Sequence, residues 1–208
     1  CVSNGYRFFI PDVVFRKGEP GASSYDAVVS GVKSLIDRYD FIDKDRIALN
    51  GHSWGGYQIA FLVTRTNMFK AAVSGAPVVN MTSAYGGIRW ESGKSRMFQY
   101  EQTQSRIGGT LWDKPAEFIR NSPLFFLPQV QTPVLIMHND KDGSVMWEQG
   151  IEFFMALRRL DKPVWLFNYK GEGHHLKKWE NRLDYSRRVM EFYDYYLKDG
   201  KKPEWMKS

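Results

Sequence analysis

Hydrophobic and polar positions divide the chain into two alternating kinds of segment. Short, nearly continuous apolar runs, typical of buried strands, occur at residues 6–11, 47–50, 71–76, 133–138 and 163–169. Segments in which apolar residues return every three or four positions, as on one face of a helix, occur at residues 25–38, 56–66, 146–160 and 177–197. Apolar strands separated by helices predict an α/β fold, with a mostly parallel sheet covered by helices on both faces.

Residues 81–122 interrupt this alternation. They show no clean period, contain the pairs Gly86-Gly87 and Gly108-Gly109, and lie between the third and fourth predicted strands. An insertion at the carboxyl end of such a sheet commonly helps to shape a substrate cleft. We therefore expect one domain over residues 1–208 with an insertion at about 81–122; plain surface loops and short helices are the alternative.

Composition limits the classes of protein that fit this pattern. A chain of 208 residues with 43% hydrophobic content can form one domain with a sizeable core. The net charge is +6, but the basic residues are scattered and form no stripe interleaved with aromatic residues, so we do not expect nucleic-acid binding. No segment is long and apolar enough to span a membrane. The single cysteine, Cys1, allows no intrachain disulfide and leaves the cellular compartment open.

The sequence Gly51-His52-Ser53-Trp54-Gly55 stands where a predicted strand turns into a predicted helix. In this G-x-S-x-G context a sharp elbow holds the serine hydroxyl out into a cleft, and small neighbours let the backbone pass close to itself. The N–H of Trp54, which opens the helix, is placed to serve as one oxyanion-hole donor. The second donor should come from a loop after an earlier strand, which this sequence does not contain. The alternative is a glycine-rich turn with an ordinary surface serine.

A serine nucleophile needs a histidine base and an acid that orients it. In chains with such an elbow the acid and then the histidine follow later strands. The fifth predicted strand is followed by a glycine-rich loop that carries His174, with His175 as the close rival. The fourth is followed by Asp140 and Asp142, and spacing alone does not choose between them. The histidine would take the proton of Ser53 and return it to the leaving group.

Two further histidines fit other roles. His52 lies inside the elbow and is predicted to point away from Ser53. His138 ends a predicted strand and is expected to be a buried, hydrogen-bonded residue. The sequence predicts no cofactor and no bound metal.

Several segments, in this order, resemble the prolyl oligopeptidase family of serine peptidases, specifically the catalytic α/β-hydrolase domain of its dipeptidyl-peptidase and acylaminoacyl-peptidase branches. The likeness runs from about Gly5 to Leu197. It rests on Gly51-His52-Ser53-Trp54-Gly55-Gly56-Tyr57, Gly75-Ala76-Pro77-Val78, Asn121-Ser122-Pro123, Asp142-Gly143-Ser144-Val145 and Gly171-Glu172-Gly173-His174.

The resemblance implies a serine-type peptidase that hydrolyses short peptides through an acyl-enzyme. The family's acid stands three residues before a valine, which selects Asp142 over Asp140. Its histidine follows a Gly-Glu-Gly turn, which indicates His174, and His175 stands where the family usually has glycine. Together with Ser53 these residues would form the triad.

The resemblance also implies residues that bind substrate. Val78 and Val145 match positions lining the pocket for the residue before the scissile bond. Met81 stands where the dipeptidyl branch has tryptophan, and Ser144 stands where a polar side chain reaches the substrate carbonyl. Both departures argue against a strict preference for proline.

The family further implies partners outside this sequence. Its members carry a β-propeller before the catalytic domain, and a second copy of this chain, in a homo-oligomer, is a further possible partner. The first three strands of the hydrolase sheet are missing here, and residues 6–10 would be the fourth strand. In the family the third strand lies between this fourth strand and the one that corresponds to residues 47–50. We therefore expect a fragment whose sheet has a gap. An esterase or other acyl hydrolase on the same fold, and a catalytically silent assembly module, are the alternative functions.

Overall fold

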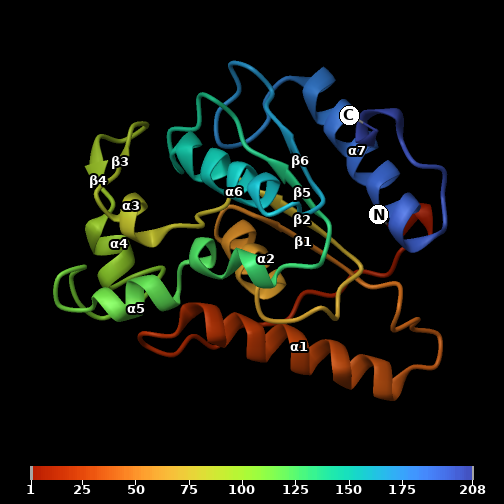
Figure 1. The fold of residues 1–208 in the computed structure, drawn as a ribbon, viewed down its shortest axis with the longest axis horizontal. Helices are drawn as coiled ribbons and strands as arrows, with labels where there is room; N and C mark the ends of the chain where they lie inside the picture. The colour runs from red at the N-terminus through yellow and green to blue at the C-terminus, as the bar shows by residue number, and fades with distance from the viewer. Residues whose placement is uncertain (1, 208) are drawn as a thin grey trace.

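Four parallel strands form the central sheet of the protein in a computed structural model, which describes residues 2–207 (Figure 1). The strands are β1 (Ala48–His52), β2 (Ala71–Gly75), β5 (Val134–Met137) and β6 (Val164–Phe167). They pair in the order β1-β2-β5-β6, and every pairing is parallel. The predicted parallel α/β architecture is therefore confirmed.

Helices cover both faces of this sheet (Figure 1). On one face lie α2 (Trp54–Val63) and α6 (Trp147–Arg159), with α1 (Pro20–Arg38) packed outside α2. On the other face lies α7 (Trp179–Leu197), followed by the short 3-10 helix η3 (Glu204–Met206). The sheet is thus the middle layer of three.

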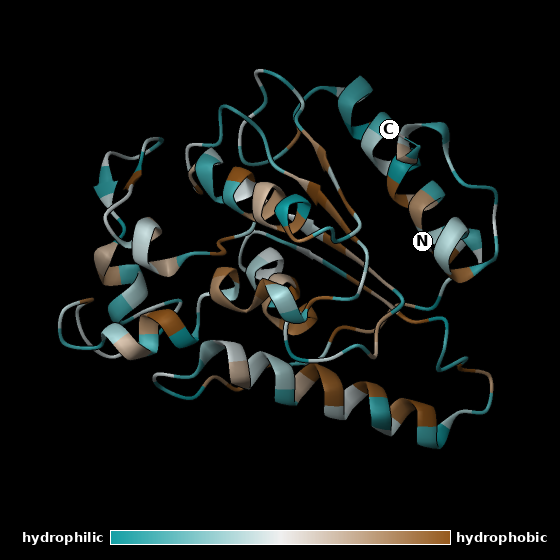
Figure 2. Ribbon diagram, viewed as in Figure 1, coloured by the Kyte–Doolittle hydropathy of each residue, from teal (hydrophilic) through white to brown (hydrophobic). Residues whose placement is uncertain are grey.

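Alternate side chains of each strand serve the two faces. Ala72 and Ile136 belong to the core cluster beneath α2 and α6, whereas Val73 and Leu135 belong to the cluster beneath α7. All four residues are fully buried. Because both faces are covered, β5 and β6 are largely hydrophobic, and the outer helices α1, α6 and α7 each carry both hydrophobic and hydrophilic residues (Figure 2).

The strand predicted at residues 6–11 is wrong. The chain forms a short 3-10 helix, η1 (Val2–Asn4), and then runs irregularly to α1. Phe9 packs its ring over Gly31 of α1, while Ile10 is 77% exposed. This segment flanks an apolar groove of about 720 Å³ between α1 and β1, so it is held by side-chain packing and not by a strand ladder. The four strands that do form pair consecutively, and the groove separates residues 6–11 from β1, at the place of the predicted gap.

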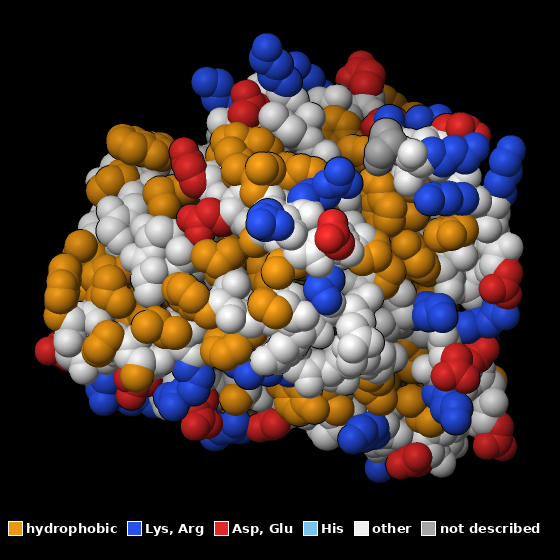
Figure 3. Space-filling view, viewed as in Figure 1, with side chains coloured by type: hydrophobic (Ala, Val, Ile, Leu, Met, Phe, Trp, Pro, Cys, Tyr) orange, Lys and Arg blue, Asp and Glu red, His pale blue; other side chains and the backbone are white. Residues whose placement is uncertain are grey.

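Short elements fill the interrupted region between β2 and β5. They are α3 (Met81–Tyr85), β3 (Ile88–Arg89), β4 (Lys94–Ser95), α4 (Met97–Glu101) and α5 (Pro115–Arg120), followed by the 3-10 helix η2 (Pro123–Gln129). The pair β3-β4 forms a small antiparallel hairpin. These elements gather at one end of the molecule, on the left in Figure 1, where hydrophobic side chains also reach the surface in Figure 3.

Lysines and arginines are distributed over the visible face and mixed with acidic residues, with no continuous basic stripe (Figure 3). Within residues 2–207, no helix combines the length and the apolar character that crossing a membrane requires.

Candidate active site

Ser53 occupies a strained turn between β1 and α2. Its backbone has φ 59° and ψ −116°, in the left-handed range that a residue with a side chain adopts only at a cost of about 1–3 kcal/mol. Two hydrogen bonds hold the turn: Ser53 N donates to Gly75 O at 2.8 Å, and Tyr57 N donates to Ser53 O at 3.0 Å. The serine is therefore fixed at the carboxyl end of β1, where the sheet and the helix together set its direction.

Two glycines allow the backbone to pass through this elbow. A Cβ on Gly51 would lie 2.4 Å from the carbonyl oxygen of Gly55, and one on Gly56 would lie 2.2 Å from the carbonyl oxygen of Gly75. No real Cβ approaches backbone so closely, so both positions require glycine. By contrast, a Cβ on Gly55 would meet nothing within 4 Å.

Ser53, His174 and Asp142 come together from three separate loops at the carboxyl edge of the sheet. Nε2 of His174 lies 2.8 Å from Oγ of Ser53, and Nδ1 of His174 lies 2.8 Å from Oδ2 of Asp142. The side chain of Asp142 is fully buried and that of His174 is 10% exposed. The rival acid, Asp140, instead accepts a hydrogen bond from the N–H of Gly171 at 2.7 Å.

The carboxylate of Asp142 is held on both oxygens. Oδ1 accepts the backbone N–H groups of Ser144 and Val145, each at 2.8 Å. Oδ2, which faces His174, also lies 3.3 Å from Nε2 of His138. Burial by itself would raise the pKa of Asp142, but the hydrogen bonds from His138, His174 and the Val145 N–H outweigh burial and hold that pKa well below its usual range. Asp142 therefore carries a stable negative charge.

His138 is a support for Asp142 that sequence reasoning did not identify. It is fully buried, as expected, and its Nε2 lies 3.1 Å from the carbonyl oxygen of Val145 as well as near Asp142. Both neighbours are acceptors, so the proton belongs on Nε2. The only sequence signal was its position at the end of β5, four residues before the acid.

Glu172 organises the loop that carries His174. Its buried carboxylate accepts the backbone N–H groups of Lys177 at 2.8 Å and Lys178 at 3.0 Å, and the side-chain amide of Asn181 at 2.6 Å. These donors lie at the start of α7, where a negative charge is favoured. From the sequence, Glu172 was interpreted only as part of a turn. Its acidic side chain, between two glycines and shortly before the basic start of a helix, could have indicated a residue that accepts the first N–H groups of that helix.

His52, His174 and His175 form a cluster of imidazole rings. Their centroids lie 4.8–4.9 Å apart in all three pairs. Burial, followed by the charges of His174 and His175, lowers the pKa of His52 to about 4, and its buried Nε2 has no hydrogen-bond partner. The three residues offer nitrogens within 4.8 Å of one another, so among residues 2–207 they form a group that could hold a metal ion. A metal there would compete with the contacts of His174, because both of its nitrogens already face Ser53 or Asp142.

The residues predicted to bind substrate lie near Trp54 and the turn after Asp142, and they are mostly buried. Val78, Met81 and Val145 belong to one apolar cluster against which Trp54 packs. Met81 is fully buried, and the two valines are each 4% exposed. Ser144 is 7% exposed and holds a neighbouring arginine by hydrogen bonding.

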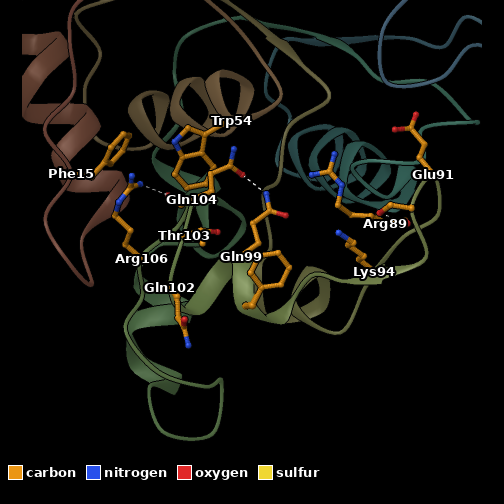
Figure 4. A pocket seen from close by; sticks show the side chains of 12 residues that line it. Phe15, Trp54, Arg89, Glu91, Lys94, Gln99, Gln102, Thr103, Gln104 and Arg106 are labelled. Atoms are coloured by element: carbon orange, nitrogen blue, oxygen red, sulfur yellow. Dashed lines mark hydrogen bonds between the residues drawn. The ribbon is translucent and has the colours of Figure 1, made fainter.

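An open cleft of about 850 Å³ lies next to Trp54 (Figure 4). Phe15 and Trp54 line one side of it, and ten of its twelve lining residues come from the segment 89–106. Most of this lining was not identified from sequence, because the segment has no period that fixes which side chains face inward.

Comparison with known proteins places this geometry in a family. The sequence pattern of the prolyl oligopeptidase family matches residues 15–200. The uncharacterized peptidase YuxL of Bacillus subtilis is 31% identical over 166 residues, which make up 78% of this chain and 23% of that protein. Human acylamino-acid-releasing enzyme is 29% identical over 174 residues, which make up 80% of this chain and 22% of the enzyme.

A solved structure shows the same fold. Acylaminoacyl peptidase of Pyrococcus horikoshii matches with a TM-score of 0.78 at 20% identity, over 92% of this chain and 30% of that one. This chain thus spans less than a quarter of the length of the two curated relatives named above. Because the family pattern covers most of its residues, the chain, with its α/β-hydrolase sheet and serine elbow, belongs to the prolyl oligopeptidase family of serine peptidases.

Proposed function

We propose that Ser53, His174 and Asp142 form the catalytic triad of a serine peptidase that hydrolyses short peptides through an acyl-enzyme. The observation that carries the proposal is the unbroken pair of 2.8 Å contacts from Ser53 Oγ to His174 and from His174 to Asp142. Loops after three different strands supply these side chains, so their alignment requires the folded sheet.

Each residue has a defined task in this mechanism. Nε2 of His174 accepts the proton of Ser53 as Oγ attacks the carbonyl carbon, and then gives it to the leaving amine as the acyl-enzyme forms. Water, deprotonated by the same nitrogen, releases the acid product and restores Ser53. Asp142 accepts the Nδ1–H and stabilises the imidazolium, a task supported by the low pKa of its carboxyl group.

Neighbouring groups would stabilise and position the substrate. The N–H of Trp54 opens α2 and is free of that helix's own hydrogen-bond ladder, so it is available to the oxyanion. We assign the residue before the scissile bond to the apolar cluster that contains Val78, Met81 and Val145, with Ser144 at its margin. Access would require a small movement of Trp54, since this cluster is almost closed.

Replacement of Ser53 tests this assignment directly. In the complete polypeptide that contains this chain, Ser53→Ala should abolish labelling by a fluorophosphonate, whereas Ser30→Ala, on the exposed side of α1, should label as the unchanged protein does. Persistent labelling of Ser53→Ala would refute the nucleophile. Comparing kcat/KM for an aminoacyl amide and the matching ester then separates a peptidase from an esterase.

We also propose that the catalytic unit works beside a β-propeller and acts on peptides that this partner admits. The support is the length of the relatives, of which this chain covers 22–23%. The sequence encoded upstream should show repeated four-stranded blades. An upstream sequence without such repeats would contradict this partner while leaving the triad unaffected.

A further inference from the structure

Basic side chains outnumber acidic ones around the cleft next to Trp54. The segment 89–106 carries four basic residues, Arg89, Lys94, Arg96 and Arg106, and two acidic residues, Glu91 and Glu101. Glu101 is engaged by the hydroxyl of Tyr85 at 2.5 Å, outside the cleft lining. The lining therefore holds three cations and one carboxylate.

The three lining cations approach the cleft from opposite sides. In Figure 4, Arg89 and Lys94 lie on one side with Glu91, and Arg106 lies on the other side near Phe15. Among the described residues, none of the three cations forms a salt bridge. Their charges are thus available to a molecule that enters between them.

Neutral groups hold the two arginines in place. Nη2 of Arg89 donates to Oγ of Ser144 at 3.1 Å, and that hydroxyl donates to Glu91 at 3.0 Å. The guanidinium of Arg106 lies 5.1 Å from the centre of the Phe15 ring, and its Nη1 donates to the carbonyl oxygen of Gln104 at 2.8 Å. Each arginine keeps further N–H donors free for a ligand.

The backbone of Arg106 is itself unusual. Its φ of 52° lies in the left-handed region, and its carbonyl oxygen accepts the N–H of Gly18 at 2.7 Å. A strained backbone at a cleft is more common at functional sites than elsewhere, because the surrounding structure must enforce it.

Arg96 adds a buried positive charge close to the same region. It is 3% exposed, its Nε and Nη1 have no hydrogen-bond partner, and its guanidinium lies 5.5 Å from the centre of the Tyr100 ring. Tyr100 belongs to the apolar cluster that contains Val78 and Val145. A buried arginine without a counter-ion is unfavourable, and a nearby anion would relieve it.

We propose that this cleft is a subsite for an acidic residue of the peptide substrate, with the Glu or Asp carboxylate held between Arg89 and Arg106 and attracted by Lys94. The inference rests on the proposed peptidase function. Its location follows from Trp54, which both lines the cleft and follows the nucleophile in sequence. A side-chain amide pair at the cleft, Gln99 Nε2 donating to Gln104 Oε1 at 2.6 Å, offers a polar surface that suits a carboxylate better than an apolar side chain.

Binding without turnover provides the first test. Ser53→Ala protein is titrated by calorimetry with two hexapeptides that differ only in having Glu or Gln at the same three central positions. The Glu peptide should bind about tenfold more tightly at low salt, and the ratio should shrink as ionic strength rises. Equal affinities would overturn the proposal.

Charge-removing variants locate the effect. Arg89→Gln and Arg106→Gln in the Ser53→Ala background should each reduce the preference for the Glu peptide by about threefold or more, and Lys94→Gln by less, since an ammonium cannot bind a carboxylate through the paired N–H groups of a guanidinium. Lys70→Gln is the matched control, because Lys70 is exposed just before β2, at the opposite edge of the sheet. Circular dichroism and Tm show whether each variant folds. If the control reduces the preference as much as the cleft variants do, the effect is only net charge and the subsite is refuted.

The complete polypeptide provides the deciding measurement. The kcat/KM of the complete polypeptide should be higher for the Glu-containing peptide than for the Gln-containing peptide, in the same ratio as the affinities. If it hydrolyses both peptides equally well, the acidic subsite is wrong and the peptidase function stands. If it hydrolyses neither while the Ser53→Ala protein still prefers the Glu peptide, the catalytic proposal fails and the subsite remains.

Discussion

Replacing Asp142 by Asn should disable His174 without disturbing the turn that holds it. Oδ1 of Asp142 accepts two backbone N–H groups, from Ser144 and Val145, so the amide oxygen of Asn must keep that position. The amide NH₂ is then forced toward Nδ1 of His174, which lies 2.8 Å from the present Oδ2. To accept this donor, His174 must carry its proton on Nε2, where it faces the hydroxyl of Ser53 and can no longer receive a proton.

The magnitude follows from losing the correct tautomer. We expect kcat of Asp142→Asn to fall by about 10⁴-fold, equivalent to about 5.5 kcal/mol of transition-state stabilisation. KM should change little, because Asp142 is buried behind His174 and does not reach the cleft. Tm should fall as well, because the two turn hydrogen bonds survive but the amide NH₂ replaces Oδ2 opposite the buried Nε2–H of His138. Stopped-flow or fluorogenic-peptide assays of the complete polypeptide measure both constants.

Asp140→Asn is the matched control for this prediction. Asp140 lies two residues away and accepts only a loop N–H, from Gly171, so its variant should keep activity within about twofold. A loss in Asp140→Asn comparable to that in Asp142→Asn would show that the loop geometry, and not the tautomer of His174, sets the rate. An Asp142→Asn protein with more than about a tenth of the original kcat would refute the reasoning outright.

Three other measurements test the geometry around the elbow. Gly56→Ala should lower the free energy of unfolding by about 3–5 kcal/mol, because its Cβ would lie 2.2 Å from the carbonyl oxygen of Gly75. Gly55→Ala should change that free energy by no more than about 1 kcal/mol, because its Cβ would meet nothing within 4 Å. Equal losses in chemical denaturation would contradict the close packing at Gly56. The lowered pKa of His52 means that this residue binds fewer protons in the folded than in the unfolded protein. Its contribution to stability is therefore complete above about pH 6.5 and is lost as the pH falls toward 4. Over that range the Tm of His52→Gln should drop less than the Tm of the unchanged protein. Zn²⁺ should inhibit hydrolysis by binding a nitrogen of His174. The Zn²⁺ concentration that halves the activity should be about tenfold higher for His175→Ala than for the unchanged protein, when each activity is expressed relative to the same protein without metal. Equal half-inhibitory concentrations would exclude the histidine cluster as the site.

The elbow and its partners were predictable because local pattern and chain order both constrain them. A strand, a G-x-S-x-G turn and a helix fix where Ser53 points, and the loops after the last two strands could hold only a few acids and histidines. The choice of Asp142 over Asp140 was different, because it came from family resemblance. In the structure the same choice follows from direction, since Asp140 faces Gly171 and Asp142 faces His174.

The failures have a common physical cause. An apolar run such as residues 6–11 can pair as a strand or lie against a helix, and only the tertiary surroundings decide between them. The start of α1 was placed five residues late, at Tyr25, because Gly21, Ser23 and Ser24 look like a loop. Pro20 at the first turn was the missed signal for the true start of that helix.

The cleft lining could not be predicted for a related reason. The elements between residues 81 and 122 are five or six residues long at most, too short to show a period or to be stable alone. Their positions depend on contacts such as the one between Ser144 and Arg89, which join segments 55 residues apart.

The turn after Asp142 connects the proposed triad to the cleft beside Trp54. Ser144 gives its backbone N–H to the acid that steadies the base and its hydroxyl to the arginine network of the cleft. One short stretch of chain therefore supports both selection and chemistry. A Ser144→Ala variant loses the hydroxyl and keeps the backbone N–H, so KM for an acidic peptide should rise while kcat stays nearly unchanged; an equal fall in kcat would show that the hydroxyl also holds the turn in place. In this protein, substitutions at residue 144 are therefore expected to change substrate preference while the backbone contact to the catalytic acid persists, so specificity can vary here at little cost to the rate.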